Sequence, residues 1–366
     1  MKKYCSLLPL CLLAGLYSCG GDKPADVLTL DLAEAVRPCG DAVAVGRNFD
    51  VVSFNDVKAP SSIVLQDMGQ SVFRIDGSHF GLVEHQLQGP TRIFRVDESD
   101  GLAELVIDCT GRGPGEYLSV SGIECRGGKF TFADEMSGKF LTYDAEGNFV
   151  SEKSMERGKN ICYIKDGNIC VGNMYGSDTD LDIFAPDGML LKSYKLSPDG
   201  VKSRMLRPQG VKNWNGAYIF QPALSDTLYR ITVDAAVPYM VLQPGKYKMP
   251  ESLYSTLDYA AMSKYIDNVD CRVYGDYAFC SFNHSEKLYR TVWSLKDASL
   301  LFSTAISGPD DVLGPQVEIN GEQVCVWPDG GNGDDFYSVL LPPDAERLFP
   351  DRGSDAGPVV VHVKVK

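Results

Sequence analysis

The sequence contains few of the residues, and none of the motifs, on which common hydrolases depend. Only four of its 366 residues are histidines. The G-x-S-x-G motif of serine hydrolases, the H-E-x-x-H motif of zinc peptidases and the S-x-D-x-G-x-x-W boxes of sialidases do not occur. The sequence therefore supplies no motif for nucleophilic or zinc-dependent hydrolysis.

Long apolar runs are missing beyond the N-terminus, since no later stretch approaches the roughly 20 apolar residues of a membrane-spanning helix. At the N-terminus, two lysines precede an apolar stretch from Tyr4 to Gly15, and Leu16-Tyr17-Ser18-Cys19 follows. This order predicts a secretory signal peptide over residues 1–18. The L-x-S-C context resembles a bacterial lipoprotein signal, which implies lipidation of Cys19. Ordinary secretion with a free Cys19 thiol and a retained anchor helix are the alternatives.

Positive charge is scarce. The formal net charge is -14, and loss of two signal-peptide lysines takes it to about -16. Such a surface repels nucleic acid and anionic lipid. We therefore expect no nucleic-acid partner, and we expect the protein to contact the membrane through its N-terminal lipid alone. The acidic surface suits cations and neutral or basic ligands.

The mature chain shows two-residue apolar alternation in short runs that end at Gly, Asp or Asn, which is typical of β-strands. A pattern of strand, glycine turn, strand, polar loop and aromatic strand recurs every 40 to 50 residues or so, as in four-stranded propeller blades. The aligned third strands begin near Arg92 and at Phe140, Leu181, Leu228, Leu288 and Phe336. The sequence predicts an all-β, six-bladed β-propeller of four-stranded antiparallel blades over 31–366, preceded by a lipid-anchor tether at 19–30.

Two segments depart from the repeat. Residues 249–268 have apolar positions at helical spacing, which predicts a short helical insertion between blades four and five. The C-terminal "GPVVVHVKVK" is a plain alternating strand that can complete the last blade. An N-terminal strand from "DVLTLDL" or "DVVSF" can share in closing the ring, and the pattern does not decide which terminus provides the clasp.

The segment "DCTGRGPGEYLSV" at 108–120 has the glycine content of a phosphate-binding loop. However, Pro114 removes a backbone donor, no Lys-Ser/Thr pair follows, and the chain continues as a strand. A type II turn with Pro114 second and Gly115 third explains the residues better. We expect this turn in the crossing from blade one to blade two.

The residues Gly111 and "GPGEY" at 113–117 resemble the G-x-GPGEY signature of six-bladed β-propeller lipoproteins of the Bacteroides group. "FLTYDAEGNFV", "SDTLYRI" and "GPVVVHVKVK" match further strands of that family. The resemblance implies the fold and an outer-membrane, lipid-anchored location facing the periplasm or the cell surface. It implies little about activity.

The loops between second and third strands and the inter-blade crossings lie on one face of a propeller, where they should form a rim of acids and bases. This rim suggests a site for a polar ligand, such as a glycan or a peptide, or for an envelope protein. Solvated loops with weak ion pairs are the structural alternative, in which Arg112 pairs with Glu116 and Tyr117 packs between blades. The ligand-binding candidates are Arg112, Glu116, Tyr117, Asp134, Arg157, Asp178, Asp180, Arg204, Asp226, His284, Glu286, Asp334 and Asp335.

A metal-dependent propeller hydrolase, lactonase or lyase acting at the channel mouth is the alternative function. No cofactor is firmly implied. "GGNGDDFYS" at 330–338 fits the calcium nonapeptide once, although such sites are built between stacked repeats, and a glycine-rich loop is the simpler interpretation.

Histidines and cysteines complete the set of reactive residues. His79, His85 and His362 suit solvated or core-edge positions, whereas His284 lies on the predicted rim. Eight cysteines remain after the signal and lipid positions are removed. In "CRVYGDYAFC" a two-residue turn places Cys271 opposite Cys280, which permits a cross-strand disulfide; two small buried residues are the alternative.

Overall fold

The computed structural model describes residues 27–59, 70–84, 91–154, 158–163, 167–173, 178–186, 188–197, 209–214, 217–222, 224–254, 258–308, 311–353 and 356–366. The predicted signal peptide, Cys19, His85 and the crossing residues Arg157 and Arg204 lie outside the described residues.

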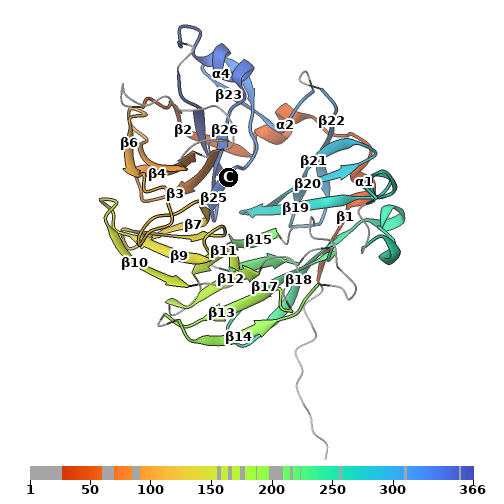
Figure 1. Cartoon of the computed structure of the whole chain (residues 1–366). Coiled ribbons are helices and arrows are strands. Elements are labelled where there is room, and N and C mark those ends of the chain that lie inside the picture. Colours follow the sequence, from red (N-terminus) through yellow and green to blue (C-terminus); the bar gives the residue numbers. More distant parts are fainter. Residues whose placement is uncertain are drawn as a thin grey trace, which may run out of the picture.

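Six blades of four antiparallel strands surround a central axis, which confirms the six-bladed β-propeller (Figure 1). Blades one to three consist of β3 (Gln70–Arg74), β4 (His79–Glu84), β5 (Arg92–Asp97) and β6 (Ala103–Ile107); β7 (Ser121–Arg126), β8 (Lys129–Asp134), β9 (Lys139–Tyr143) and β10 (Phe149–Ser154); and β11 (Gly158–Tyr163), β12 (Ile169–Asn173), β13 (Leu181–Phe184) and β14 (Leu190–Tyr194). Blades four to six consist of β15 (Gln209–Trp214), β16 (Ala217–Gln221), β17 (Thr227–Ile231) and β18 (Ala236–Gln243); β19 (Asp267–Tyr274), β20 (Tyr277–His284), β21 (Lys287–Ser294) and β22 (Leu300–Ile306); and β25 (Gly330–Asn332), β26 (Asp335–Val339), β27 (Val359–Val365) and β2 (Phe49–Asp56).

The repeat located the third strand of blades one to five to within one residue, but it was wrong for blade six. Phe336 lies in β26, which is the second strand of that blade, and β27 is the third. The reason is a long connection that includes α4 (Pro342–Leu348) and separates β26 from β27. A separate hairpin of β23 (Gln316–Ile319) and β24 (Glu322–Cys325) precedes β25 and was not predicted.

This topology defines two faces of the ring. The crossing face carries the inter-blade crossings and the loops between second and third strands. The hairpin face carries the turns between first and second strands.

The N-terminal segment, residues 27–56, follows the outer edges of blades four, five and six (Figure 1). Its first strand, β1 (Leu28–Asp31), pairs in parallel with β18 as an extra strand of blade four. Cys39 then forms an isolated bridge with Ser303 of blade five, and β2 pairs antiparallel with β27 in blade six. The segment also contains two short helices, α1 (Leu32–Ala35) and α2 (Ala42–Gly46). The strand containing "DVVSF" therefore completes blade six, whereas "DVLTLDL" borders blade four.

The insertion between blades four and five is confirmed, but it is a series of short turns and not one long helix. These turns bury a small cluster of Met249, Tyr254 and Met262. The carboxylate of Asp258 caps the last turn by accepting from the backbone N–H of Ala261 at 2.9 Å. The elements are η2 (Gly245–Tyr247), η3 (Glu251–Leu253) and α3 (Tyr259–Met262).

The turn predicted from Pro114 and Gly115 is also confirmed. The N–H of Glu116 donates to the carbonyl of Gly113 at 3.1 Å, and Gly115 has φ of +72°, as a type II turn requires. The carboxylate of Glu116 folds back and accepts from the N–H of Gly113 at 2.7 Å. A Cβ on Gly111 would lie 2.1 Å from that carboxylate, which explains the glycine at this position.

Tyr117 fastens this crossing between the first two blades. Its side chain is fully buried, and its hydroxyl donates to the carbonyl of Thr91 at 2.7 Å in blade one. Its ring meets Phe132 of blade two edge to face at 5.1 Å between centroids. Burial of a large apolar side chain contributes about 1.5–3 kcal/mol, so this ring is a strong contact between blades.

Two aspartates stabilise inter-blade crossings by accepting hydrogen bonds from backbone N–H groups of the crossing residues. Asp134 accepts from the N–H groups of residues 118 and 119 at 2.9 and 3.1 Å. Asp180 accepts in the same way from residues 196 and 197 at 2.6 and 2.8 Å. Backbone donors in irregular segments need acceptors, and these carboxylates supply them.

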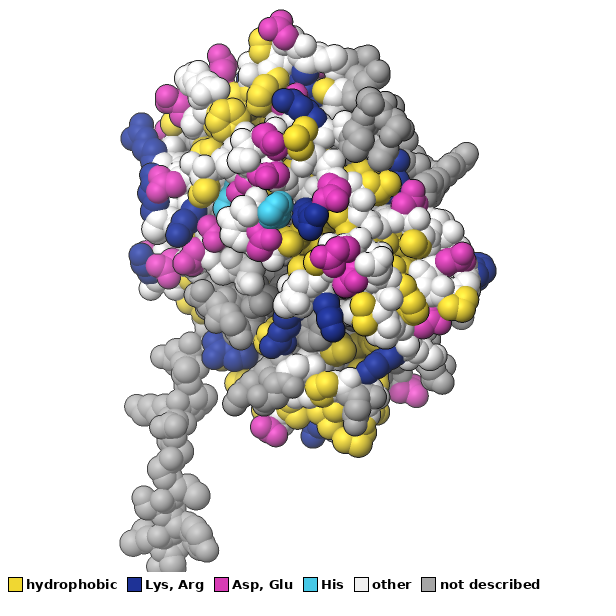
Figure 2. Space-filling view, turned by 90° about the vertical axis from the view of Figure 1, so that its left-hand side faces the viewer, with side chains coloured by type: hydrophobic (Ala, Val, Ile, Leu, Met, Phe, Trp, Pro, Cys, Tyr) yellow, Lys and Arg dark blue, Asp and Glu magenta, His cyan; other side chains and the backbone are white. Residues whose placement is uncertain are grey.

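The outer surface of blades two and three remains open to solvent. All residues of β10 are exposed, and Leu190 of β14 is 52% exposed. Lys and Arg side chains lie among Asp and Glu side chains on the side of the ring shown in Figure 2. The negative net charge is therefore spread over a surface of mixed sign on this side.

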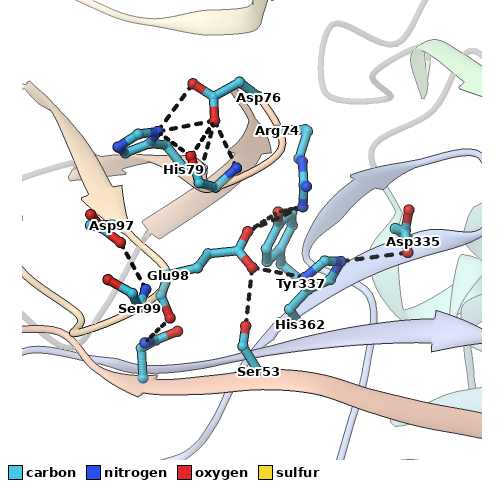
Figure 3. A network of polar contacts seen from close by, with 12 residues as sticks. Ser53, Arg74, Asp76, His79, Asp97, Glu98, Ser99, Asp335, Tyr337 and His362 are labelled. Atoms are coloured by element: carbon cyan, nitrogen blue, oxygen red, sulfur yellow. Dashed lines mark hydrogen bonds and ion pairs between the residues drawn. The ribbon is translucent and has the colours of Figure 1, made fainter.

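Blade six is joined to blade one by a network centred on Glu98 in the turn between β5 and β6 (Figure 3). Its carboxylate accepts from Arg74 of β3 at 3.1 Å and from the Tyr337 hydroxyl of β26 at 2.8 Å. It also accepts from Ser53 of β2 at 3.1 Å and lies 3.0 Å from Nδ1 of His362 in β27. Burial acts to raise the pKa of Glu98, but the contacts with His362, Tyr337 and Arg74 lower it overall. One carboxylate thus connects four strands across the point where the ring closes.

We expect Glu98→Gln to lower the free energy of unfolding by about 2–4 kcal/mol, because an amide presents N–H donors to groups that need an acceptor. Urea denaturation measures the change. The matched control is Glu104→Gln, since Glu104 pairs with Arg95 while its side chain is 64% exposed, and a surface pair contributes roughly 0–1 kcal/mol. Equal effects of the two substitutions would contradict the central role of Glu98.

Burial acts to raise the pKa of Asp134, but hydrogen bonds from Ser137, Leu118 and Ser119 lower it below 3.8. A lowered pKa adds stability above the unfolded value, and this stability is lost as the pH falls through the folded value. Asp134→Asn should therefore lower the free energy of unfolding at neutral pH by about 1–3 kcal/mol. The gap between wild type and variant should narrow as the pH falls below 3.8. Denaturation at several pH values measures this difference in the free energy of unfolding, with Asp178→Asn as the control because Asp178 is exposed. A difference between wild type and Asp134→Asn that stayed constant with pH would refute the prediction.

Candidate functional site

The structure places most of the predicted rim residues on one face. Asp134, Asp178, Asp180, Asp226 and His284 lie at or beside connections between second and third strands, on the crossing face. Glu286 lies beside His284, and Arg112 lies in the crossing from blade one to blade two. These loops of blades two to five therefore share one face, and their role as a ligand-binding rim stays a prediction.

Asp334 and Asp335 are on the opposite face, and their assignment to the rim was wrong. They follow β25 and belong to the turn between the first and second strands of blade six. The carbonyl of Asp334 accepts from the N–H of Val365, and Gly333 contacts the turn at Gly275 in blade five. The error arose because the third strand of blade six was misplaced.

Several crossing-face residues are already occupied by structural contacts. Asp134 is fully buried, and Asp180 accepts from a neighbouring crossing. Asp226 pairs with Lys248 at 2.7 Å. Glu116 and Tyr117 serve the crossing itself, as described above. Their chemistry is used to hold loops together, which leaves fewer carboxylates for a ligand.

Arg112, Asp178 and Glu286 are exposed on the crossing face. The contact of Glu116 with its own turn replaces the pair with Arg112 that we considered. These three side chains remain accessible to a partner.

His284 is 7% exposed, and its ring lies 4.4 Å from that of Tyr247 between centroids. Its Nε2 lies 3.3 Å from the Ser285 hydroxyl, whereas its Nδ1 is buried without a partner. His284 therefore lies under the rim, where it packs against the insertion between blades four and five.

His362 is 5% exposed and lies within the Glu98 network of Figure 3. Of the two predicted positions, solvated or at the edge of the core, the solvated one is therefore wrong. Its ring stacks on Tyr337 at 4.7 Å between centroids. A solvated position is excluded because β27 is paired along both edges, with β26 and β2, and the His362 side chain meets Glu98 of blade one.

Cys271 and Cys280 lie opposite each other in the register of β19 and β20, and both are buried. The predicted turn at 275–276 is thus correct, and the disulfide between them stays a prediction. In the calcium-like segment, a Cβ on Gly330 would lie 1.7 Å from the carbonyl oxygen of Val72. Close approach of two backbones accounts for that glycine without a metal.

The central channel contains a cavity of about 570 Å³ between the inner strands of the blades. Among its lining residues are 72–74 and 271–274, which end β3 and β19, so the cavity extends towards the hairpin face. Among the residues that the structure describes, the charged side chains at its wall are Arg74, Glu124, Arg126, Arg272 and Asp329.

The charged groups of the cavity are held by their neighbours. Glu98 orients Arg74 from outside the cavity at 3.1 Å, and Asp270 accepts from Nε of Arg272 at 3.0 Å. Asp329 accepts from the N–H of Val339 at 2.7 Å, and burial raises its pKa. A wall with three guanidinium groups and two carboxylates offers donors and acceptors to a polar ligand.

This cavity was missed by sequence reasoning, although a signal was present. Inner strands of blades two and five both carry an acid-Cys-Arg sequence, at 124–126 and 270–272. The alternation of a strand places the acid and the arginine of each triplet on the same side. These two triplets lie in inner strands, outside the third strands and loops that define the predicted repeat.

No group of three or more His, Cys, Asp and Glu side chains able to hold a metal ion is found within the described ranges. Over the same part of the chain, no helix is both long and apolar enough to cross a membrane.

Solved structures resemble this chain over nearly its whole length. A protein of Bacteroides fragilis NCTC 9343, described as a "putative exported protein", has a TM-score of 0.70 at 13% identity, covering 93% of this chain and 99% of that chain. A DUF4221 family member from Bacteroides vulgatus ATCC 8482 has a TM-score of 0.52 at 11% identity, covering 88% of this chain and 99% of that chain. At these identities the likeness concerns the fold. None of the curated proteins compared with the chain matches it.

The predicted resemblance to propeller proteins of the Bacteroides group agrees with these two structures. A family model matches residues 105–358, from the outer strand of blade one to the residue before β27. The chain therefore belongs to the family described as a domain of unknown function, DUF4934.

Proposed function

We propose that the protein is an exported, lipid-anchored envelope protein that binds a polar ligand, such as a glycan or a peptide, in its central channel. The observation that carries this proposal is the cavity of about 570 Å³ with its charged wall. Its volume falls within the roughly 300–1,000 Å³ typical of small-molecule sites. The guanidinium and carboxylate groups suit hydroxyl, amide and carboxylate groups of a ligand.

The proposed site is the channel and not the rim, because Asp134 and Asp180 are engaged by backbone donors. Exposed crossing-face residues such as Asp178 and Glu286 remain available to an envelope protein partner. A metal-dependent hydrolase, lactonase or lyase has no specific observation in its favour.

The location rests on the N-terminal sequence and on the exported relative. The B. fragilis protein described as exported shares the fold over 93% of this chain. In the sequence, Cys19 directly follows the predicted signal peptide. The first described strand, β1, lies on the outer edge of blade four, beside β18.

Once a glycan or peptide screen of the purified mature protein identifies a ligand, Arg126→Ala should weaken its binding tenfold or more. The reason is the loss of hydrogen bonds to a charged group, worth about 1.5–3 kcal/mol each. Calorimetry measures the affinity. Lys192→Ala is the control, because Lys192 is exposed on the outermost strand of blade three. A ligand that binds both variants equally well would place the site outside the channel.

Cys19→Ala should release the protein from the membrane fraction, because an acyl chain on this thiol is the proposed anchor. Fractionation of cells and labelling with a fatty-acid analogue measure the change. Cys11→Ala is the matched control, since residue 11 lies within the predicted signal peptide. Membrane retention of the Cys19 variant would overturn the lipid anchor and leave the channel proposal untouched.

A further inference from the structure

A second cavity, of about 310 Å³, lies between blades five and six near the crossing face. It is bordered by the ends of β22 and β26 and by the start of the connection that contains α4. Asp329 borders both this cavity and the channel. The apolar part of its wall includes Leu288, Ile306, Leu313, Trp327, Leu341 and Pro342.

Arg290 is the cationic group of this mostly apolar wall. Its guanidinium lies over the ring of Trp327 at 4.8 Å from the centroid, and its Nη1 donates to the carbonyl of Leu313 at 2.8 Å. Its Nε is buried and has no hydrogen-bond partner. A buried donor without an acceptor costs about 1–3 kcal/mol or more when the group is charged. The cavity therefore contains a fixed, incompletely satisfied cation.

The neighbouring acids do not satisfy this donor. Asp344 accepts from the N–H of Cys325 at 3.1 Å and pairs with Arg347. Asp329 accepts from the N–H of Val339, and burial raises its pKa, which disfavours its charged form. Among the residues that the structure describes, Arg290 forms no ion pair within 4.0 Å.

We propose that this cavity binds a small monocarboxylate with a short branched apolar chain. A carboxylate oxygen pairs with the guanidinium of Arg290 where that group lines the cavity, since guanidinium and carboxylate groups form strong charge-assisted hydrogen bonds. The apolar chain packs against Trp327 and Leu313. A phosphate fits less well, because the wall provides one cation and mostly apolar side chains to a strongly hydrated group.

The test uses 4-methylpentanoate as the probe and the full mature protein. Binding is measured by NMR line broadening and by Trp fluorescence, with Trp327→Phe used to assign the fluorescence change. We expect one site per chain, and we expect 4-methylpentanol, which lacks the charge, to bind at least tenfold more weakly. Equal binding of acid and alcohol, or no binding of the acid, would overturn the proposal.

Arg290→Met keeps the apolar stem of the side chain and removes the guanidinium, so it should weaken 4-methylpentanoate binding at least tenfold. The control is Arg95→Met, because Arg95 pairs with Glu104 on the surface of blade one. Unchanged affinity in the Arg290 variant would also refute the site. If that variant fails to fold, the comparison of acid and alcohol on the wild-type protein still decides the question. A parallel titration with N-acetyl-leucine measures whether the C-terminal carboxylate of a peptide enters the same cavity.

This inference is independent of the channel ligand. Arg126→Ala should leave 4-methylpentanoate binding unchanged, and Arg290→Met should leave the binding of a channel ligand unchanged. The failure of one proposal is thereby distinguishable from the failure of the other.

Discussion

A propeller remains a ring if its last blade stays fastened to its first, and here that contact is centred on the carboxylate of Glu98. The carboxylate gathers donors from β2, β3 and β26 and lies against His362 of β27. Sheet pairing between β2 and β27 provides the second connection, because the two strands come from opposite ends of the chain. Folding of blade six therefore requires both termini, and the N-terminal segment must pass blades four and five to reach it.

The same use of carboxylates continues around the crossing face. Irregular crossings expose backbone N–H groups that no neighbouring strand satisfies, and Asp134 and Asp180 accept from them. Glu116 does the same for its own turn. Part of the negative charge of these loops thus serves as hydrogen-bond acceptors that hold the loops in place. Rim carboxylates seen in a sequence are for this reason weak evidence of a binding site.

Some guanidinium groups of the chain face its two cavities. Although the chain has a net charge of -14, both cavities present arginines at their walls. Salt screens the overall negative field beyond about 8–10 Å, whereas a buried cation acts at short range inside a cavity. The two proposed ligands would in this way meet arginines at a few defined positions of an otherwise acidic protein.

The sequence by itself determined the number of blades, the third strands of blades one to five, the type II turn at Gly115 and the position of the insertion. These features depend on local alternation and on turn residues, which operate over a few positions of the chain. The tertiary structure decided which terminal strand closes blade six, on which face Asp334 lies, and how deeply His362 and Tyr117 are buried. It also decided which arginines meet in a cavity, because Arg74, Arg126 and Arg272 come from three different blades. Such contacts depend on how the blades close into a ring, and no local pattern carries that information.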